Sequence, residues 1–550
     1  MKTLRLIIFT LLFLPVSGLF ASPYDMILAG DPVLEDLRYI SLESGKSILS
    51  FTAPLAPHEV ENFLNSIDES LLSPPAQEAF DRVKTRLTAE TPLTLPLPSD
   101  ILSISLNVSA TFEAMSKFNK DISWYPLYPD IPALISAPIK LSFLNSLQLY
   151  VEPTLGVSPT SYGNFEYFNT NLPFGQNSHD KNLPLRAFIA AGGPWWNFQL
   201  GRDRLAFGTG ISGNLTIADN PAFYEFMRLS LFSSFFKYSI LVNQMPLRIT
   251  EELYAKPFVA RQDPDSLMMS TQRYYYLHRL DWNFFDILSV SLMEGLIVGN
   301  SALEIRYLNP FAVFHNFFSS HQYDYWKESQ DGHMNGSFFS LEINWNIIKS
   351  LAAYGQFAMT QFALRSELKN VPLQPPNGLG FMGGLQYTHS FNTWGSHFYL
   401  ECIYTDPYLY INSTPFASFI HMRSVSASST GSLYYDVGYP RDTISLAFGT
   451  KFFNKDMLII TGDFAWLRQG EHAGPPIKWD WEKTPDAFNE TTPTGTVQDK
   501  FIASVGAQWK PFGFLTFNAG LTGIFSLNNN HVSGSNQAGG QASFSVNFTY

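Results

Sequence analysis

The sequence predicts a mainly β fold, a transmembrane antiparallel β-barrel of about eighteen strands that is preceded by a small N-terminal helical domain. Two patterns along the chain predict the barrel. Apolar and polar side chains alternate with a period of two over many segments, and short turns alternate with long connections. A third observation, an export signal at the amino terminus, places the mature chain outside the cytoplasm.

The composition excludes several other classes of protein. Of the 550 residues, 45% are hydrophobic and 15% are aromatic, which is too apolar for an intrinsically disordered chain. A net charge of −12 argues against a nucleic-acid-binding protein, which would show a basic surface. Cys402 is the single cysteine, so a disulfide scaffold and a cysteine-rich zinc domain are both excluded. We expect Cys402 to be a small packing residue, and we expect no cofactor.

Residues 1–21 have the layout of a secretory signal peptide. Lys2 and Arg5 precede a mainly apolar run, and small residues lead to a predicted cleavage point after Ala21. The alternative, an uncleaved anchoring helix, is disfavoured because the run is short and is basic at one end only. No later stretch reaches the roughly 18 apolar residues of a transmembrane helix. The mature chain is therefore expected to cross a membrane by strands.

Residues 22–99 are predicted to form the helical domain, on the periplasmic side of the barrel. Apolar residues recur at helical spacing behind Pro57, and Ser73 followed by Pro74 is a typical helix start. Residues 93–100 form the linker to the barrel. This region is interpreted either as a simple packing element or as a plug or periplasmic handle for the barrel.

Residues 100–550 are assigned to the barrel because two-residue alternation dominates there. In the last segment, every second residue from Ala542 to Tyr550 is apolar, and the residues between them are polar. Segments 339–346 and 515–522 alternate in the same way. One face of each strand is expected to meet lipid, and the other to line a lumen.

Short turns and long connections alternate along the same region. The long connections are polar or aromatic, and they fall near 158–184, 247–273, 298–335, 406–440 and 466–498. Short turns at one end and long loops at the other are typical of an outer-membrane barrel, whereas the alternative, a soluble β-sandwich, needs no such asymmetry. The strand number is expected to be even, with a possible additional hairpin within 406–440.

Motifs that suggest catalysis or metal binding are interpreted as structural. Gly208 to Gly213 matches the GxGxxG pattern, but a dinucleotide site needs a βαβ unit, which an exported barrel does not have. His315 and His321 lie in one predicted loop, where histidines are more often plain polar residues than metal ligands. We therefore expect no metal site and no enzymatic activity.

Charged and amide side chains gather in two predicted strands and in the residues after them. They are Arg202, Asp203, Arg204, Arg279, Asp281, Glu294, Arg306 and Asn309. One interpretation is a network of paired charges in the lumen or at its rim, because charges inside a barrel must pair or stay hydrated. The other is a strip that contacts a ligand. Arg202 and Glu294 have the parity of the lipid face, so both are expected beyond a strand end or a bulge.

The predicted outward loops are rich in aromatic residues that interleave with acids and amides. The candidate ligand-binding residues are Trp124, Tyr128, Tyr325, Trp326, Trp479 and Trp481. Flat aromatic faces flanked by hydrogen-bonding groups suit sugar rings, whose C–H faces stack while their hydroxyl groups bond sideways. The alternative interpretation is an aromatic girdle at the membrane surface together with loop cores.

Three regions of the chain also follow a known pattern in order and content. They are Gly30-Asp31-Pro32 with the helices after it; Gly201–Gly208 (GRDRLAFG) with Gly213-Asn214-Leu215 and Asp219-Asn220; and His278–Trp282 (HRLDW) with Met293–Gly299 and Arg306–Pro310. These regions resemble the Wzi-like capsule assembly family of outer-membrane proteins. The resemblance implies an eighteen-stranded barrel with a periplasmic-side helical bundle. It also implies lectin-like attachment of exported capsular polysaccharide, without catalysis.

The sequence therefore predicts a protein of the cell outer membrane that binds and anchors surface or capsular polysaccharide and is not an enzyme. The expected partners are the polysaccharide, outer-membrane lipid and, during biogenesis, the barrel-assembly machinery; no nucleic acid is expected. The alternative function is a porin or transporter for small or apolar solutes, because a barrel of this size has room for a pore. A surface hydrolase is a third class, and it would need carboxylates that converge in the lumen.

Overall fold

The computed structural model describes most of the chain that follows the predicted signal peptide. The described residues are 24–88, 95–96, 102–121, 132–144, 146–157, 166–174, 184–219, 221–248, 270–299, 302–314, 335–362, 376–412, 415–424, 432–455, 457–474 and 490–550. The signal peptide predicted over residues 1–21 lies outside them.

Strands dominate the described residues. The longer ones are β3 Leu102–Leu106, β4 Ser109–Lys117, β6 Ile139–Phe143, β7 Leu147–Val151, β10 Ala187–Gly193, β11 Trp196–Asp203, β13 Tyr224–Phe232, β14 Phe236–Gln244, β17 Arg273–Phe284, β18 Leu288–Gly299, β19 Asn335–Ile348, β20 Leu351–Gln361, β21 Gly378–Phe391, β22 Trp394–Thr405, β23 Ile420–Ser424, β24 Ser432–Asp436, β25 Thr443–Asn454, β26 Leu458–Gln469, β27 Gln498–Phe512, β28 Leu515–Leu527 and β29 Gln537–Thr549. The shorter ones are β1 Thr52–Ala53, β2 Leu95–Pro96, β5 Ile135–Ser136, β8 Thr154–Leu155, β9 Phe168–Thr170, β12 Ala206–Phe207, β15 Leu247–Arg248 and β16 Ser270–Thr271.

The strand pairings close into a ring, and all of them are antiparallel. β29 pairs with β4, from Thr549 opposite Ser109 to Gln541 opposite Lys117, so the last strand meets the first. β3 pairs with β6 while β4 pairs with β5, and β6 pairs with β7 while β5 pairs with β8. β3 with β4, β5 with β6, and β7 with β8 therefore each form one interrupted strand of the wall. If each of these is counted once, the ring contains eighteen strands. The predicted fold class is confirmed, and closure pairs the edges that the strands would otherwise expose.

Side chains alternate between the two faces of the wall as predicted. In β19, Glu342 and Asn344 point inward and are buried, whereas Ile343 and Trp345 are exposed on the outer face. In β29, the exposed Phe544 alternates with buried polar residues in the same way. The outer face of the barrel is thus apolar and suited to lipid, because every second residue of a strand points to the same side.

The helical domain contains three α-helices, α2 Val33–Ser44, α3 Pro57–Asn65 and α4 Pro74–Thr88, and the short 3₁₀ helix η1 Glu69–Leu71. The helix start predicted at Ser73-Pro74 is confirmed, since α4 begins at Pro74, and α3 likewise begins with a proline, Pro57. Proline suits the first helical position because the N–H that it lacks would have no partner there. α2 ends where Gly45 adopts a φ of 73°, a left-handed conformation that glycine tolerates. Apolar faces of the three helices pack together and against Phe453 of β25.

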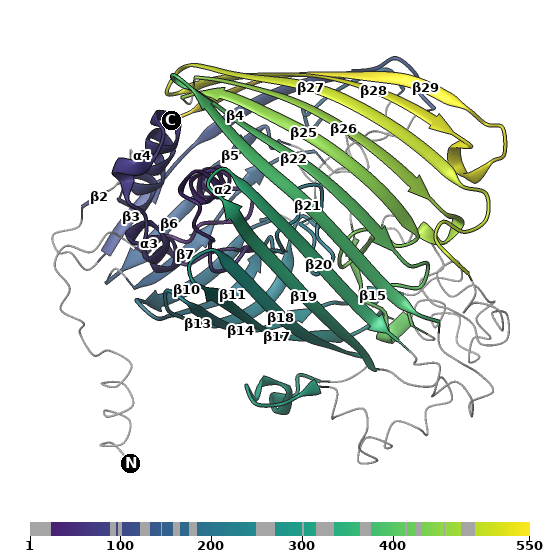
Figure 1. Cartoon of the computed structure of the whole chain (residues 1–550), viewed down its shortest axis with the longest axis horizontal. Coiled ribbons are helices and arrows are strands. Elements are labelled where there is room, and N and C mark those ends of the chain that lie inside the picture. The colour runs from purple at the N-terminus through teal and green to yellow at the C-terminus, as the bar shows by residue number, and fades with distance from the viewer. Residues whose placement is uncertain are drawn as a thin grey trace.

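The helical domain is fixed inside one end of the barrel, the end that also holds the chain's C-terminus (Figure 1). Its Glu59 accepts a hydrogen bond from the buried Lys237 of β14 at 2.5 Å. The short turns of the barrel lie at the same end, since Lys349 Nζ donates to the Leu71 carbonyl oxygen at 2.7 Å. The long connections leave the opposite end, which agrees with the predicted asymmetry.

The lumen is largely filled by the chain itself. Besides the helical domain, the described parts of two internal segments occupy it, those of residues 204–223 between β11 and β13 and those of residues 406–442 between β22 and β25. Leu215 and Tyr410 from these segments are fully buried in one apolar cluster with inward side chains of the wall. The second segment contains the hairpin β23–β24, so the extra hairpin expected near 406–440 is present. It forms a separate two-stranded sheet and contributes no strand to the barrel wall.

Candidate functional site

The glycine-rich segment Gly208–Asn214 forms a tight loop in the lumen. Glu401 of β22 holds it, since its carboxylate accepts from the backbone N–H groups of Ile211 at 2.9 Å and Ser212 at 3.1 Å and from the Ser212 hydroxyl. A Cβ atom on Gly210 would lie 1.8 Å from the Gly213 carbonyl oxygen, which explains the glycines. The GxGxxG match is therefore a lumenal loop, as its rejection as a dinucleotide site implied.

Gln356 of β20 adds a second attachment for this loop. Its amide oxygen accepts from Leu215 N–H at 2.7 Å, and its amide nitrogen donates to Asn214 Oδ1 at 2.8 Å. Both Gln356 and Glu401 have inward parity, and both are buried. Two wall residues on adjacent parts of the sheet thus tie one loop, which we name the plug loop (Gly208–Leu215), across the lumen.

Arg279 and Asp281 face the lumen, as predicted, and a third residue completes their group. Arg279 Nε donates to Asp281 Oδ1 at 2.9 Å, and Arg279 Nη1 donates to Glu342 Oε1 at 2.7 Å. All three side chains are almost fully buried. The two carboxylates that converge here both pair with the one guanidinium between them, so this buried group stiffens the wall and offers no exposed acid–base pair.

Asp203 and Arg204 also lie on the inner side, in a different network. Asp203 accepts from Gln199 at 3.0 Å and pairs with Arg186 at 3.3 Å, while Arg204 pairs with Asp219 at 3.2 Å. These ion pairs border a polar cavity of about 390 Å³ between the amino-terminal segment and β3, β6 and β7. Its charged lining residues are Asp31, Arg86, Lys140, Arg186 and Arg204.

Asp25 fastens the amino-terminal segment to the wall beside this cavity. Its carboxylate accepts from Arg86 Nη1 and from Lys140 Nζ, both at 2.6 Å, and from Gln148 at 2.9 Å. Burial opposes ionisation of Asp25, but the two adjacent cations outweigh it and hold the pKa of Asp25 below its usual value. The clamp is therefore an ionic one at neutral pH.

The prediction that Arg202 and Glu294 lie beyond a strand end or a bulge is wrong. Arg202 is inside β11 on the outer face, where its Nε donates to Glu225 Oε1 at 2.6 Å and its guanidinium lies 4.2 Å from the Phe223 ring. Glu294 is inside β18, opposite His278 of β17. Arg202 stays on the outer face paired with Glu225, and Glu294 stays there half-buried beside His278.

Arg306 and Asn309 are outside the lumen as well, which corrects their assignment to a lumen or rim network. They belong to a segment that we name the strap, residues 302–314, which contains the 3₁₀ helix η3 Ile305–Leu308. The strap packs on the outer face of β14, β17 and β18 through Tyr307 and Phe314. Figure 1 shows η3 outside the ring of strands. The eight predicted charged and amide residues are therefore divided between two lumenal networks and the outer wall.

The candidate loop aromatics, from Trp124 to Trp481, lie outside the described residues. The structure does describe both stems of the 475–489 segment that contains Trp479 and Trp481. Asp442 is buried and accepts from His472 N–H at 3.0 Å on one stem and from Thr494 N–H at 3.1 Å on the other. Arg441 Nη2 bonds the Gly474 carbonyl oxygen beside them. One buried carboxylate therefore sets the spacing of the two stems.

Asp442, Glu401 and Gln356 were missed as functional residues by sequence reasoning. Glu401 and Gln356 have the inward parity of their strands, and this parity is the signal that could have found them. Asp442 precedes the first residue of β25 and has a φ of 54°, and no sequence pattern distinguishes it from an ordinary turn residue. Cys402, expected as a packing residue, is exposed on the outer face of β22.

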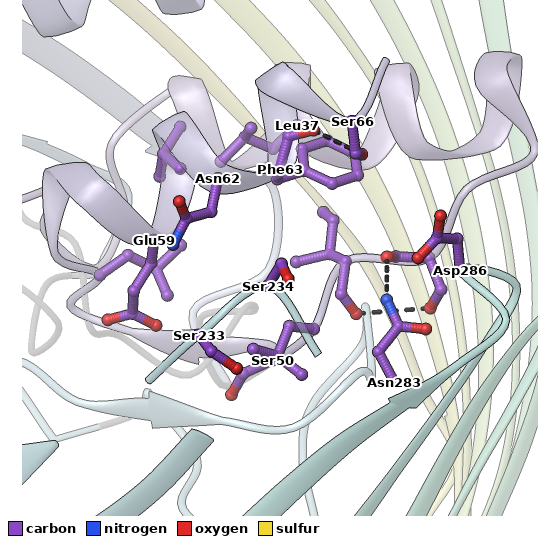
Figure 2. Close-up of a pocket in the computed structure, with 15 residues that line it drawn as sticks. Leu37, Ser50, Glu59, Asn62, Phe63, Ser66, Ser233, Ser234, Asn283 and Asp286 are labelled. Carbon is purple, nitrogen blue, oxygen red and sulfur yellow. Dashed lines mark hydrogen bonds between the residues drawn. The ribbon is translucent and has the colours of Figure 1, made fainter. Parts of the chain in front are cut away.

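A small pocket marks the seam between the helical domain and the short turns of the barrel. Figure 2 shows Leu37 and Phe63 above it and Ser233, Asn283 and Asp286 on its barrel side. The cavity has a volume of about 50 Å³, far below the 300 Å³ at which ligand sites typically begin. Asn283 Nδ2 donates to the Ser47 carbonyl oxygen at 3.1 Å across the seam. The pocket is therefore a packing defect at a joint.

Within the part of the chain that the structure describes, no group of three or more His, Cys, Asp or Glu side chains is placed to hold a metal ion. His315 and His321 are outside that part. Among the described helices, none has the length and apolar character needed to span a membrane.

Comparison with known proteins identifies the fold. No protein-family model matches the sequence, and no curated protein matches it. Among solved structures, Wzi of Escherichia coli, described as an outer-membrane protein involved in group 1 capsule assembly and as a carbohydrate-binding β-barrel, has a TM-score of 0.55 and 13% identity, covering 96% of this chain and 99% of its own. The predicted resemblance to Wzi is confirmed at the level of the fold.

Two further solved structures are less similar to this chain. OprD of Pseudomonas aeruginosa has a TM-score of 0.37 and 9% identity, covering 81% of this chain and 95% of its own. A loop-deletion mutant of OmpT of Vibrio cholerae has a TM-score of 0.32 and 8% identity, covering 82% and 100%. TM-scores this low carry no argument about function, so the functional reasoning depends on the residues themselves.

Proposed function

We propose that this protein is an outer-membrane β-barrel that binds and anchors surface or capsular polysaccharide at the cell surface and has no catalytic activity. The observation that carries the proposal is the filled lumen. The helical domain, the plug loop and the 406–442 segment occupy the space that a pore would need. A barrel filled in this way serves as a rigid support for its long loops.

The loop stems support binding at the end opposite the helical domain. Asp442 joins the two stems of the 475–489 segment, and Tyr408 bonds Glu490 on one of them. Prior fixation of a loop lowers the entropy that binding must otherwise overcome. Trp479 and Trp481 in that segment are therefore our candidates for sugar stacking. The fold shared with a carbohydrate-binding barrel supports polysaccharide as the ligand class.

A transporter for small solutes is the second candidate, and one observation favours it. A polar cavity of about 400 Å³ remains beside the lumenal wall of β4, β27, β28 and β29. Gln508, Asn518 and Ser545 form a hydrogen-bonded ladder along it, with distances of 3.0 Å. Nearer the long loops, however, the inward Ile502 and Ile524 belong to the apolar cluster that includes the internal segments. Apolar closure of this kind opposes the passage of water and ions.

The test is polysaccharide binding by refolded mature protein in lipid. Polysaccharide extracted from the producing organism should bind saturably, and the double variant Trp479→Ala with Trp481→Ala should bind less tightly. The matched control is Trp509→Ala, an exposed tryptophan on the outer face near a short turn. Equal binding by all three proteins would remove the loop tryptophans from the site. Stable single-channel conductance in a planar bilayer, without polysaccharide binding, would instead favour the transporter.

A further inference from the structure

The strap is attached to the barrel wall by specific contacts. Tyr307 and Phe314 are fully buried against it, with ring centroids 5.0 Å from Tyr276 and 4.4 Å from His278 respectively. Hydrogen bonds join wall side chains to the backbone of the strap. Tyr276 Oη accepts from Glu304 N–H at 2.8 Å, His278 Nε2 donates to the Tyr307 carbonyl oxygen at 3.0 Å, and Tyr238 Oη donates to the Pro310 carbonyl oxygen at 2.9 Å.

The strap covers a polar side chain on the outer face of the wall. His278 and Glu294 oppose each other on the outward face of β17 and β18, where a bare wall would present them to hydrocarbon. Polar groups exposed to lipid without a partner are strongly unfavourable. The strap buries His278 and supplies a hydrogen-bond acceptor for it, the carbonyl oxygen of Tyr307. The imidazole of His278 is thereby kept away from hydrocarbon.

The strap also lies at a definite height on the wall. Tyr276 and His278 are in the half of β17 that is nearer the long connections. Directly beside them, a row of cross-strand neighbours is apolar: Leu280, Leu292, Leu341, Phe357 and Phe381. Leu292 and Phe381 in this row are exposed. An uncovered apolar band on the outside of a barrel is the surface that meets acyl chains.

The outward side of the strap continues that band. Four of its apolar side chains point away from the wall, with exposed fractions of 47% for Leu303, 79% for Ile305, 90% for Phe311 and 50% for Val313. We propose that the strap is a lipid-embedded element, whose Leu303, Ile305, Phe311 and Val313 insert among the acyl chains of the outer leaflet. This inference depends on the proposed membrane insertion but not on polysaccharide binding.

The occupant is lipid because the surface on which the strap sits is already the lipid-facing surface. The strap adds apolar area to a wall that is apolar on both sides of it, and its own polar backbone groups turn inward to Tyr276, His278 and Tyr238. Arg306, the exposed cation of the strap, is paired with Glu304 of the same segment. The other possible occupant, a second copy of the chain, is distinguished by the experiment.

Spin labelling in lipid vesicles tests the inference. The exposed native Cys402, on the outer face of β22, serves as the lipid-facing reference when it is labelled with a nitroxide. In a Cys402→Ser background, single cysteines are introduced as Phe311→Cys and Ile305→Cys. Val532→Cys, in the loop between β28 and β29 and 58% exposed, is the water-facing reference. Each label is then compared for its collision rates with oxygen, which dissolves in lipid, and with a nickel chelate, which stays in water.

The labels at 311 and 305 should behave like the label at Cys402, with collisions dominated by oxygen, and unlike the label at 532. Collisions dominated by the nickel chelate at 311 would overturn the inference, because the strap would then face water. Low accessibility to both reagents, with spin–spin broadening that disappears on dilution with unlabelled protein, would also overturn it and assign the face to a second copy. If Cys402 itself proved accessible to nickel, the proposed membrane insertion would fail first.

Discussion

Replacing Glu401 by glutamine should release the plug loop from the barrel wall. The carboxylate bonds the N–H groups of Ile211 and Ser212, the Ser212 hydroxyl and the Tyr354 hydroxyl, and each oxygen accepts two of these bonds. A glutamine keeps one accepting oxygen and presents an NH₂ group in place of the other. At least one buried loop donor then loses its acceptor, which costs about 1–3 kcal/mol. The remaining bonds weaken because they no longer involve a charge, by about 1 kcal/mol.

The combined loss is about 3 kcal/mol, which corresponds to roughly a hundred-fold shift in the equilibrium between docked and undocked loop. Hydrogen exchange of the amides of Ile211 and Ser212, followed by mass spectrometry of peptides from residues 208–215, measures this equilibrium. The expected result is exchange about a hundred-fold faster in Glu401→Gln, with no change in peptides from β27.

Asn518→Ala is the matched control, because Asn518 faces the same lumen but its hydrogen bonds run to Gln508 and Ser545 and not to the plug loop. Its loop peptides should exchange as in the native protein. If Glu401→Gln changed loop exchange by less than about threefold while the barrel stayed folded, Glu401 would not be the latch that the geometry indicates.

Three further outcomes are expected. Since the pKa of Asp25 is depressed, its clamp is intact above the unfolded value of about 3.9 and is lost as the pH falls through the lower folded value. Proteolysis of the helical domain should therefore rise in acid. The variant Asp25→Asn should be equally sensitive to the protease at neutral pH. Lys237→Met leaves Glu59 buried without its cation and should lower the free energy of unfolding by about 3–5 kcal/mol, measured by urea titration, whereas adding Glu59→Gln should recover part of it. Asp442→Ala removes the hydrogen bonds that hold the two stems at Thr494 and His472, and it should weaken polysaccharide binding. An affinity within about twofold of native would show that the stems do not support the binding site.

The wall of this barrel could be predicted from the sequence because its physical cause is local. A strand between lipid and lumen must alternate every second residue, so segments such as 339–346 and 515–522 reveal both the strand and its inward face. Turn and loop lengths also predicted that the short turns share one end of the barrel, and they do. The same parity correctly placed Arg279 and Asp281 in the lumen.

The filling of the lumen could not be predicted in detail, because its contacts join residues that are far apart in sequence. Glu401 bonds Ser212 across 189 positions, and Lys237 bonds Glu59 across 178. Each of these residues is an ordinary polar residue on the inner face of its strand, or an ordinary helix residue. Parity says that such a side chain points inward, but it does not say which segment will meet it there.

On the outer wall, parity gave the right face for a charged residue, but the assumption of a bare wall led to a wrong position. Parity placed Glu294 on the lipid side, and the expectation that a charge cannot stay there moved it, incorrectly, beyond the end of its strand. That expectation holds for a bare wall. Here residues 302–314 fold back over the outer face, so His278 keeps its outward parity under a cover, with the half-buried Glu294 opposite it on β18. A charge at a lipid-facing position of a predicted strand is therefore a signal to search the following loop for a covering segment with aromatic anchors, such as Tyr307 and Phe314.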